Sequence, residues 1–168
     1  MPSQKTVKPL SAAMIRVRVL RRLRKYHSKN QLEHFALFMG GVQILELHHK
    51  GLLAHRYGME QESMERWTLG RIAKEMHAAG VRPDYCELLK HIVEQRNFIA
   101  HEMLASDALL RSLVKGPEGR FSRKILYPAT YELEQLFVLA QWCDKYQGWD
   151  ATRSLPSSAE LLTPFDSR

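Results

Sequence analysis

Three side chains within one short segment could together act on a phosphodiester: Arg96, Asn97 and His101. A histidine titrates near neutral pH, so His101 can take the proton of a ribose 2′-hydroxyl or protonate the leaving 5′-oxygen. The guanidinium of Arg96 can stabilise the negative charge that develops around phosphorus. Asn97 lies one helical turn before His101, at the spacing that lets the two side chains touch. The chemistry that this set favours is metal-independent cleavage of RNA.

The helix that must carry these residues is expected over 83–104, with Pro83 in its first turn. At about 100° per residue its apolar side chains form one stripe, and Arg96 falls in the middle of it. An arginine cannot shed its charge, so its burial is costly unless an anion or an acceptor meets it. The apolar stripe comprises Tyr85, Leu88, Leu89, Ile92, Val93, Ile99, Ala100 and Met103.

Arg96 therefore has two interpretations. It either belongs to a functional site or forms an internal salt bridge, with Glu46 or Glu132 from another helix as the partner. His101 lies about 140° around a regular helix from Arg96, so the two side chains do not share a face. They converge if the helix bends or ends near His101, or if two copies of the helix face each other across a symmetric interface.

The string Arg96-Asn97-x-x-Ala100-His101 resembles the signature of the HEPN superfamily, in which an arginine is followed by four to six residues and a histidine. The segment 68–72, Thr-Leu-Gly-Arg-Ile, resembles the opening of the preceding helix in several HEPN-like families. The resemblance covers about residues 31–104, with 127–149 as the closing helix. The chain has Met103 where one toxin subfamily carries a tyrosine, so regulation through that tyrosine does not carry over.

This resemblance implies an all-α fold, an up-and-down four-helix HEPN-like bundle with an extra basic N-terminal helix. It also implies a metal-independent endoribonuclease that needs no cofactor and whose site, Arg96, Asn97 and His101, forms at a homodimer interface. Phe98 would then make an intersubunit contact. A toxin or antiviral defence setting, with a cognate antitoxin or regulatory protein as a separate chain, is implied by the resemblance alone. The alternative is a HEPN-like module without cleavage activity that binds nucleic acid or regulates a protein partner.

Positive charge is concentrated at the N-terminus. Nine lysines and arginines precede the first acidic residue, although the net charge of the whole chain is +7. On an expected helix, one basic face comprises Arg18, Arg21, Arg22 and Lys25. Such a face binds phosphate in a salt-dependent, sequence-independent way, and RNA is the partner that we expect. A solvated face without a ligand, an anionic membrane surface and an acidic protein are the alternatives.

A second basic group follows the turn signal Gly116-Pro117 and consists of Arg120, Arg123 and Lys124. These cations either extend the RNA-binding surface or make a loop soluble. Residues 105–115 are expected to form a short helix or a packed loop, and the last strong helix is expected over 127–146.

The chain divides into a basic arm over 1–30, a helical bundle over 31–149 and a mostly extended tail over 150–168. The longest helix of the bundle is expected over 31–57. Two adjacent glycines, Gly40 and Gly41, interrupt it and indicate either a kink or the close approach of a neighbouring helix.

The composition, 45% hydrophobic and 26% charged, is that of a soluble globular protein. The longest apolar stretch, 35–45, is shorter than the roughly 20 residues that a membrane span needs. No signal peptide is visible, so we expect a cytoplasmic protein. Cys86 and Cys143 occur singly, and the histidines of 48–55 lack metal-ligand spacing, so neither a disulfide nor a metal site is expected.

Overall fold

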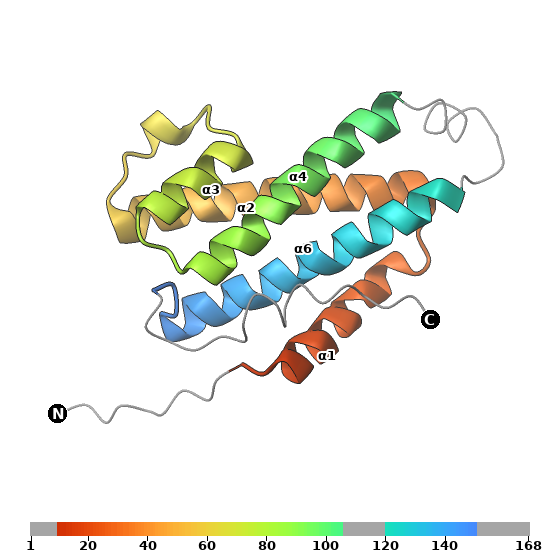
Figure 1. Ribbon diagram of the computed structural model, residues 1–168, viewed down its shortest axis with the longest axis horizontal. Helices are drawn as coiled ribbons and strands as arrows, with labels where there is room; N and C mark the ends of the chain where they lie inside the picture. Colours follow the sequence, from red (N-terminus) through yellow and green to blue (C-terminus); the bar gives the residue numbers. More distant parts are fainter. Residues whose placement is uncertain (1–9, 106–119, 151–168) are drawn as a thin grey trace.

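Every regular element that the structure describes is a helix (Figure 1). The computed structural model describes residues 10–105 and 120–150, with side chains over 10–101 and 124–150. The all-α class is therefore confirmed for these residues, and none of their helices has the length and apolar character to cross a membrane. The elements are α1 (Ala12–Leu23), η1 (Arg24–Tyr26), α2 (Gln31–Tyr57), η2 (Glu62–Met64), α3 (Leu69–Ala78), α4 (Pro83–Ala105) and α6 (Arg120–Tyr146).

Local hydrogen bonds explain where several helices begin and end. At the start of α2, Asn30 Oδ1 accepts from the Glu33 amide and the Glu33 carboxylate accepts from the Asn30 amide, both at 2.9 Å. The helix ends at Gly58, which adopts the left-handed conformation with φ of 69°. The Thr68 hydroxyl accepts from the Arg71 amide and begins α3. The expected bounds of α2 are confirmed.

The last helix begins earlier than the sequence predicts. We expected it to start at Tyr127, after a loop, whereas α6 already begins at Arg120 and passes through Pro128. A proline inside a helix removes one backbone hydrogen bond. Here Leu126 and Ala129, on either side of it, are fully buried, so packing holds the helix together across the proline. Most of residues 105–115 and of the expected tail, 150–168, lie outside the described residues.

The core is built around α6, which contacts α1, α2 and α4, while α3 packs on α4 and α2 (Figure 1). A Cβ added to Gly41 of α2 would lie 2.8 Å from Leu133 Cδ2 of α6. The close approach of a neighbouring helix is therefore the reason for Gly41. A Cβ on Gly40 would meet no atom within 4 Å, so the same reason does not apply there.

The basic arm is part of this core from Leu10 onward. The apolar seam of α1 is buried against the body, with Ile15, Val19 and Leu23 each at most 1% exposed. Tyr26 of η1 adds a fourth buried side chain. The N-terminal helix is thus docked, and its charged residues flank a packed seam.

A buried carboxylate completes the contact between α1 and α6. Glu134 is fully buried; its Oε1 accepts from the Tyr26 hydroxyl at 2.7 Å and lies 2.6 Å from Lys25 Nζ, while Oε2 pairs with the Arg22 guanidinium. Burial raises the pKa of Glu134, but the hydrogen bonds from Lys25, Arg22 and Tyr26 outweigh it and hold that pKa below its ordinary value. The ionised carboxylate therefore fastens α1 to α6.

We expect Glu134→Gln to lower the free energy of unfolding by about 1.5–3 kcal/mol, the range for hydrogen bonds to charged groups, because an amide cannot satisfy both cations. Urea unfolding measures the change. The matched control is Glu75→Gln, whose carboxylate lies 4.0 Å from Arg71 at the surface. Such a pair contributes at most about 1 kcal/mol. An equal loss of unfolding free energy in the two variants would contradict a structural role for Glu134.

Candidate functional site

Arg96 lies at the surface of α4, which corrects its expected place on the buried stripe. Its Nη1 donates to Asn97 Oδ1 at 3.0 Å. The two acids suggested as partners are engaged elsewhere: Glu46 pairs with Lys50 at 3.0 Å, and Glu132 lies 2.7 Å from His91 Nδ1. The internal salt bridge with either acid is therefore wrong, and the guanidinium is available to solvent.

Helix α3 lies beside α4 only as far as the turn before Arg96. A Cβ on Gly70, in the first turn of α3, would lie 3.4 Å from a Val93 methyl group. Helix α3 therefore begins level with Val93, about one turn before Arg96. Ile99, on the same stripe and further from α3 than Arg96, is nevertheless fully buried, so the end of α3 does not by itself account for the exposure of Arg96.

His101 and Phe98 are also exposed, Phe98 by 49% of its surface. Helix α4 continues through His101 to Ala105 and runs straight in Figure 1, so it does not end where Arg96 and His101 would need it to. Their convergence therefore requires a second copy of the chain. We call Arg96, Asn97, Phe98 and His101 the α4 patch.

A groove between α3 and α4 approaches the α4 patch from one side. Its volume is about 1060 Å³, and its charged lining is mixed in sign, with more cationic than acidic side chains. Lys90 and Glu94 of this lining lie at helical spacing before Asn97 and His101, so all four share one face of α4. The titratable side chains that line the groove are Arg71, Lys74, His77, Cys86, Glu87, Lys90 and Glu94. Sequence reasoning missed the groove because it lies between two helices.

The basic residues expected to bind nucleic acid divide into two groups. Arg18 and Arg21 are exposed on α1, and Lys124 is exposed on α6. Arg22 and Lys25 also pair with buried Glu134, a partner that the sequence did not predict, and their contact with nucleic acid stays a prediction. Arg120 and Arg123 open α6, which corrects the expected loop, and their side chains lie outside the described residues.

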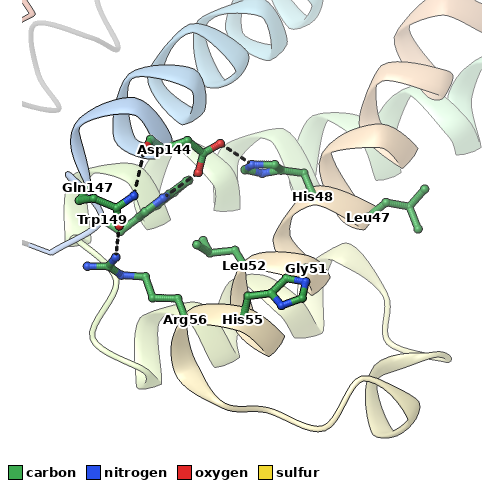
Figure 2. Close-up of a pocket in the computed structure, with 9 residues that line it drawn as sticks. All are labelled: Leu47, His48, Gly51, Leu52, His55, Arg56, Asp144, Gln147 and Trp149. Carbon is green, nitrogen blue, oxygen red and sulfur yellow. Dashed lines mark hydrogen bonds and ion pairs between the residues drawn. The ribbon is translucent and has the colours of Figure 1, made fainter.

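A pocket between α2 and the end of α6 was not predicted (Figure 2). His48 Nε2 lies 2.8 Å from one oxygen of Asp144, and Trp149 Nε1 donates to the other at 3.0 Å. Arg56, on the opposite side, donates to Gln147 at 2.6 Å and to Asp150 at 2.8 Å. The lining of this pocket, about 690 Å³ in volume, is Leu47, His48, Gly51, Leu52, His55, Arg56, Asp144, Gln147 and Trp149.

The chemistry of this pocket is limited. Its lining contains no hydroxyl or thiol nucleophile, and Arg56 is engaged by Asp150 and Gln147. His48 and Asp144 are 96 positions apart, so no local signal in the sequence could have paired them. The contacts serve to fasten residues 147–150 to α2.

The remaining reactive side chains are buried. His49 is fully buried, and its Nε2 lies 2.8 Å from the Tyr85 hydroxyl. Burial, assisted by the nearby His48, lowers the pKa of His49 to about 3. Burial also raises the pKa of the Cys86 thiol to about 11 and that of Cys143 to about 12. These thiols are not nucleophiles at neutral pH. The described residues contain no group of three or more potential metal ligands.

Comparison with known proteins finds no matching family model, no matching curated protein and no matching solved structure. The interpretation of the α4 patch therefore depends on its own geometry and on the resemblance of its motif.

Stability should rise with pH between about 3 and 6.5, because over this range His49 binds a proton only when the chain is unfolded. One such group contributes up to about 1.4 kcal/mol per pH unit. Urea unfolding at several pH values measures the slope, and we expect His49→Gln to reduce it. The control His27→Gln removes an exposed histidine in place of the buried one. An unchanged slope in His49→Gln would show that His49 is not held neutral.

Proposed function

We propose that this protein is a metal-independent endoribonuclease of HEPN type, with Arg96, Asn97 and His101 as its catalytic residues. The observation that carries the proposal is the exposure of the α4 patch. Arg96 is held at the surface by its neighbour Asn97 at 3.0 Å, and His101 is exposed on the same helix. An arginine with a purely structural role would be expected to pair with an acid, whereas Glu46 and Glu132 have other partners.

The proposed reaction uses one histidine from each of two copies. His101 of one copy, in its neutral form, takes the proton of the ribose 2′-hydroxyl as the 2′-oxygen attacks phosphorus. The phosphorus–5′-oxygen bond breaks, and the protonated His101 of the other copy donates its proton to the leaving oxygen. Arg96 stabilises the charge on the phosphorane, and Asn97 positions Arg96 through the hydrogen bond described above. The products end in a 2′,3′-cyclic phosphate and a 5′-hydroxyl.

The surroundings of the α4 patch favour a single-stranded RNA substrate. The groove between α3 and α4 presents Arg71, Lys74 and Lys90, which can contact a phosphate backbone. Phe98 is 49% exposed beside Asn97, so its ring is available for stacking on a base or for contact with a second copy. The groove therefore supplies a path along α4 that leads to His101.

On this proposal α2, α3, α4 and α6 form the four-helix HEPN-like bundle, and α1 is the additional basic helix. The exposed Arg18 and Arg21 of α1, together with Lys124, extend the phosphate-binding surface. The protein would act in the cytoplasm as a toxin or a phage-defence component, and an antitoxin or regulatory protein would restrain it.

A second candidate is a HEPN-like module without catalytic activity that binds nucleic acid or another protein. A specific observation favours it: apolar side chains of α2 are exposed on the side of the helix that faces away from the core, among them Ile44 at 60% and Leu47 at 68%. A surface of this kind marks a protein contact. The first candidate cleaves the RNA that it binds, whereas the second does not cleave RNA.

We expect the native chain to cleave labelled single-stranded RNA in the presence of EDTA and to leave 2′,3′-cyclic phosphate ends. Arg96→Ala and His101→Ala should each reduce kcat by about 100-fold or more, because general acid–base catalysis and charge stabilisation each contribute on this order. Lys90→Ala should raise KM and leave kcat nearly unchanged, since Lys90 would contact only the substrate backbone.

The matched controls are Arg66→Ala and His27→Ala, an arginine and a histidine at exposed positions outside the α4 patch and the groove. Both should retain native kcat. If the native chain binds RNA in a salt-dependent way but does not cleave it, the second candidate is correct. Cleavage that survives in His101→Ala would refute the assigned site.

A further inference from the structure

The groove between α3 and α4 contains two carboxylates that a path for a phosphate backbone does not require. Glu87 and Glu94 both line it and are exposed, and within the described chain neither forms a hydrogen bond or an ion pair. Lys90 lies between them at helical spacing and pairs with neither. An unpaired carboxylate repels phosphate. Its place in the groove is explained if it accepts hydrogen bonds from another part of a nucleotide.

The two carboxylates differ in their distance from His101. Glu87, Glu94 and His101 follow one another at intervals of seven residues, so all three lie on one face of α4. From the rise of an α-helix, Glu94 lies about 10 Å from His101 along the helix axis, and Glu87 lies about 21 Å from it. A strand whose scissile phosphate lies at His101 can therefore bring a nearby base to Glu94. Glu87 is twice as far from the reacting group.

The end of the groove at Glu94 has further features that suit a base. A Cβ on Gly70 would lie 3.4 Å from Val93 Cγ1 and 3.9 Å from Thr68 Oγ1, so this methyl group and this hydroxyl lie at the same end. Val93 offers an apolar surface to the face of a base. The Thr68 hydroxyl accepts from the Arg71 amide and keeps its own proton to donate. An acceptor, a donor and an apolar surface are thus available together.

The acceptor selects among the four bases. An ionised carboxylate has two oxygens that only accept hydrogen bonds. The Watson–Crick edge of guanine presents two adjacent donors, N1–H and the exocyclic amino group, with the acceptor O6 beside them. Adenine and cytosine present one amino group beside an acceptor nitrogen, and uracil presents one N–H between two carbonyl oxygens. A single strand leaves this edge free for a protein to contact. Guanine is therefore the base that Glu94 fits.

We propose that the Glu94 carboxylate binds the N1–H and amino groups of a guanine in the RNA strand, while the Thr68 hydroxyl donates to its O6. The substrate class is then single-stranded RNA with a guanine close to the cleaved bond. The inference rests on the proposed function for the path of the strand, but it concerns binding and not the chemical step. Glu94 determines specificity and takes no part in catalysis.

Fluorescence anisotropy with labelled oligonucleotides tests the proposal. The probes are short oligouridines with one central guanine or one central adenine, and they carry 2′-deoxy sugars throughout so that no 2′-hydroxyl can attack. The native chain should bind the guanine probe about 10- to 100-fold more tightly than the adenine probe, as for a bidentate contact with one base. Circular dichroism confirms that every variant remains folded.

Glu94→Gln should abolish the preference for guanine, because an amide offers one donor and one acceptor. It should bind the adenine probe at least as tightly as the native chain does, because one negative charge has left the groove. The matched control is Glu87→Gln, which removes a carboxylate from the same face and the same groove. This control should keep the native preference for guanine.

A change in the base tests the same contact from the side of the ligand. Hypoxanthine in place of guanine removes the amino group and keeps N1–H and O6. It should weaken binding by the native chain about 10-fold, as for a hydrogen bond to a charged group, and should weaken binding by Glu94→Gln much less. Equal weakening in the two proteins would overturn the contact between Glu94 and the amino group.

Mapping of the cleaved ends of a random-sequence RNA separates this inference from the ribonuclease function. If the native chain prefers the guanine probe and cleaves no RNA, guanine recognition stands and the ribonuclease function fails. If it cleaves RNA without enrichment of guanine near the cut and binds both probes equally, the ribonuclease function stands and this inference fails. The inference is also overturned if the preference for guanine survives in Glu94→Gln.

Discussion

The buried carboxylate of Glu134 sets the arrangement of the basic part of this protein. A carboxylate in a core is stable only when charged or hydrogen-bonding partners surround it, and here Arg22, Lys25 and Tyr26 supply them from α1 and η1. Because α6 also contacts α2 and α4, the helix that carries Glu134 connects the basic N-terminus to the rest of the fold. Two cations of the basic N-terminal segment thereby contribute to the fold.

The parts of the fold that local chemistry determines could be predicted from the sequence. The parts that depend on contacts between distant helices could not. The bounds of α2 follow from the capping box at Asn30 and the left-handed Gly58. The exposure of Arg96, between buried Ile92 and Ile99 of the same stripe, depends instead on how the neighbouring helices pack on α4, which helical periodicity cannot reveal. The pairing of His48 with Asp144 likewise joins residues with no shared sequence signal.

Two exposed surfaces stand out by the same physical criterion, since each holds residues whose presence the described chain does not explain. The α4 patch exposes an arginine, a histidine and a phenylalanine beside a groove whose charged lining is mixed in sign. The outer face of α2 exposes Ile44 and Leu47, and it contains Gly40 and Gly51, where an added Cβ would meet no atom within 4 Å. The first surface suits a phosphodiester and a base.

The most direct test of the α4 patch is to map where RNA binds. A single-stranded RNA oligonucleotide would be added to the isotopically labelled protein while its amide chemical shifts are followed. The oligonucleotide carries a 2′-deoxy sugar at every position that is cleaved. The account predicts the largest changes over Asn97–His101, with smaller ones along the groove at Lys74 and Lys90. Changes confined to Arg18 and Arg21 of α1, with α4 unaffected, would contradict it.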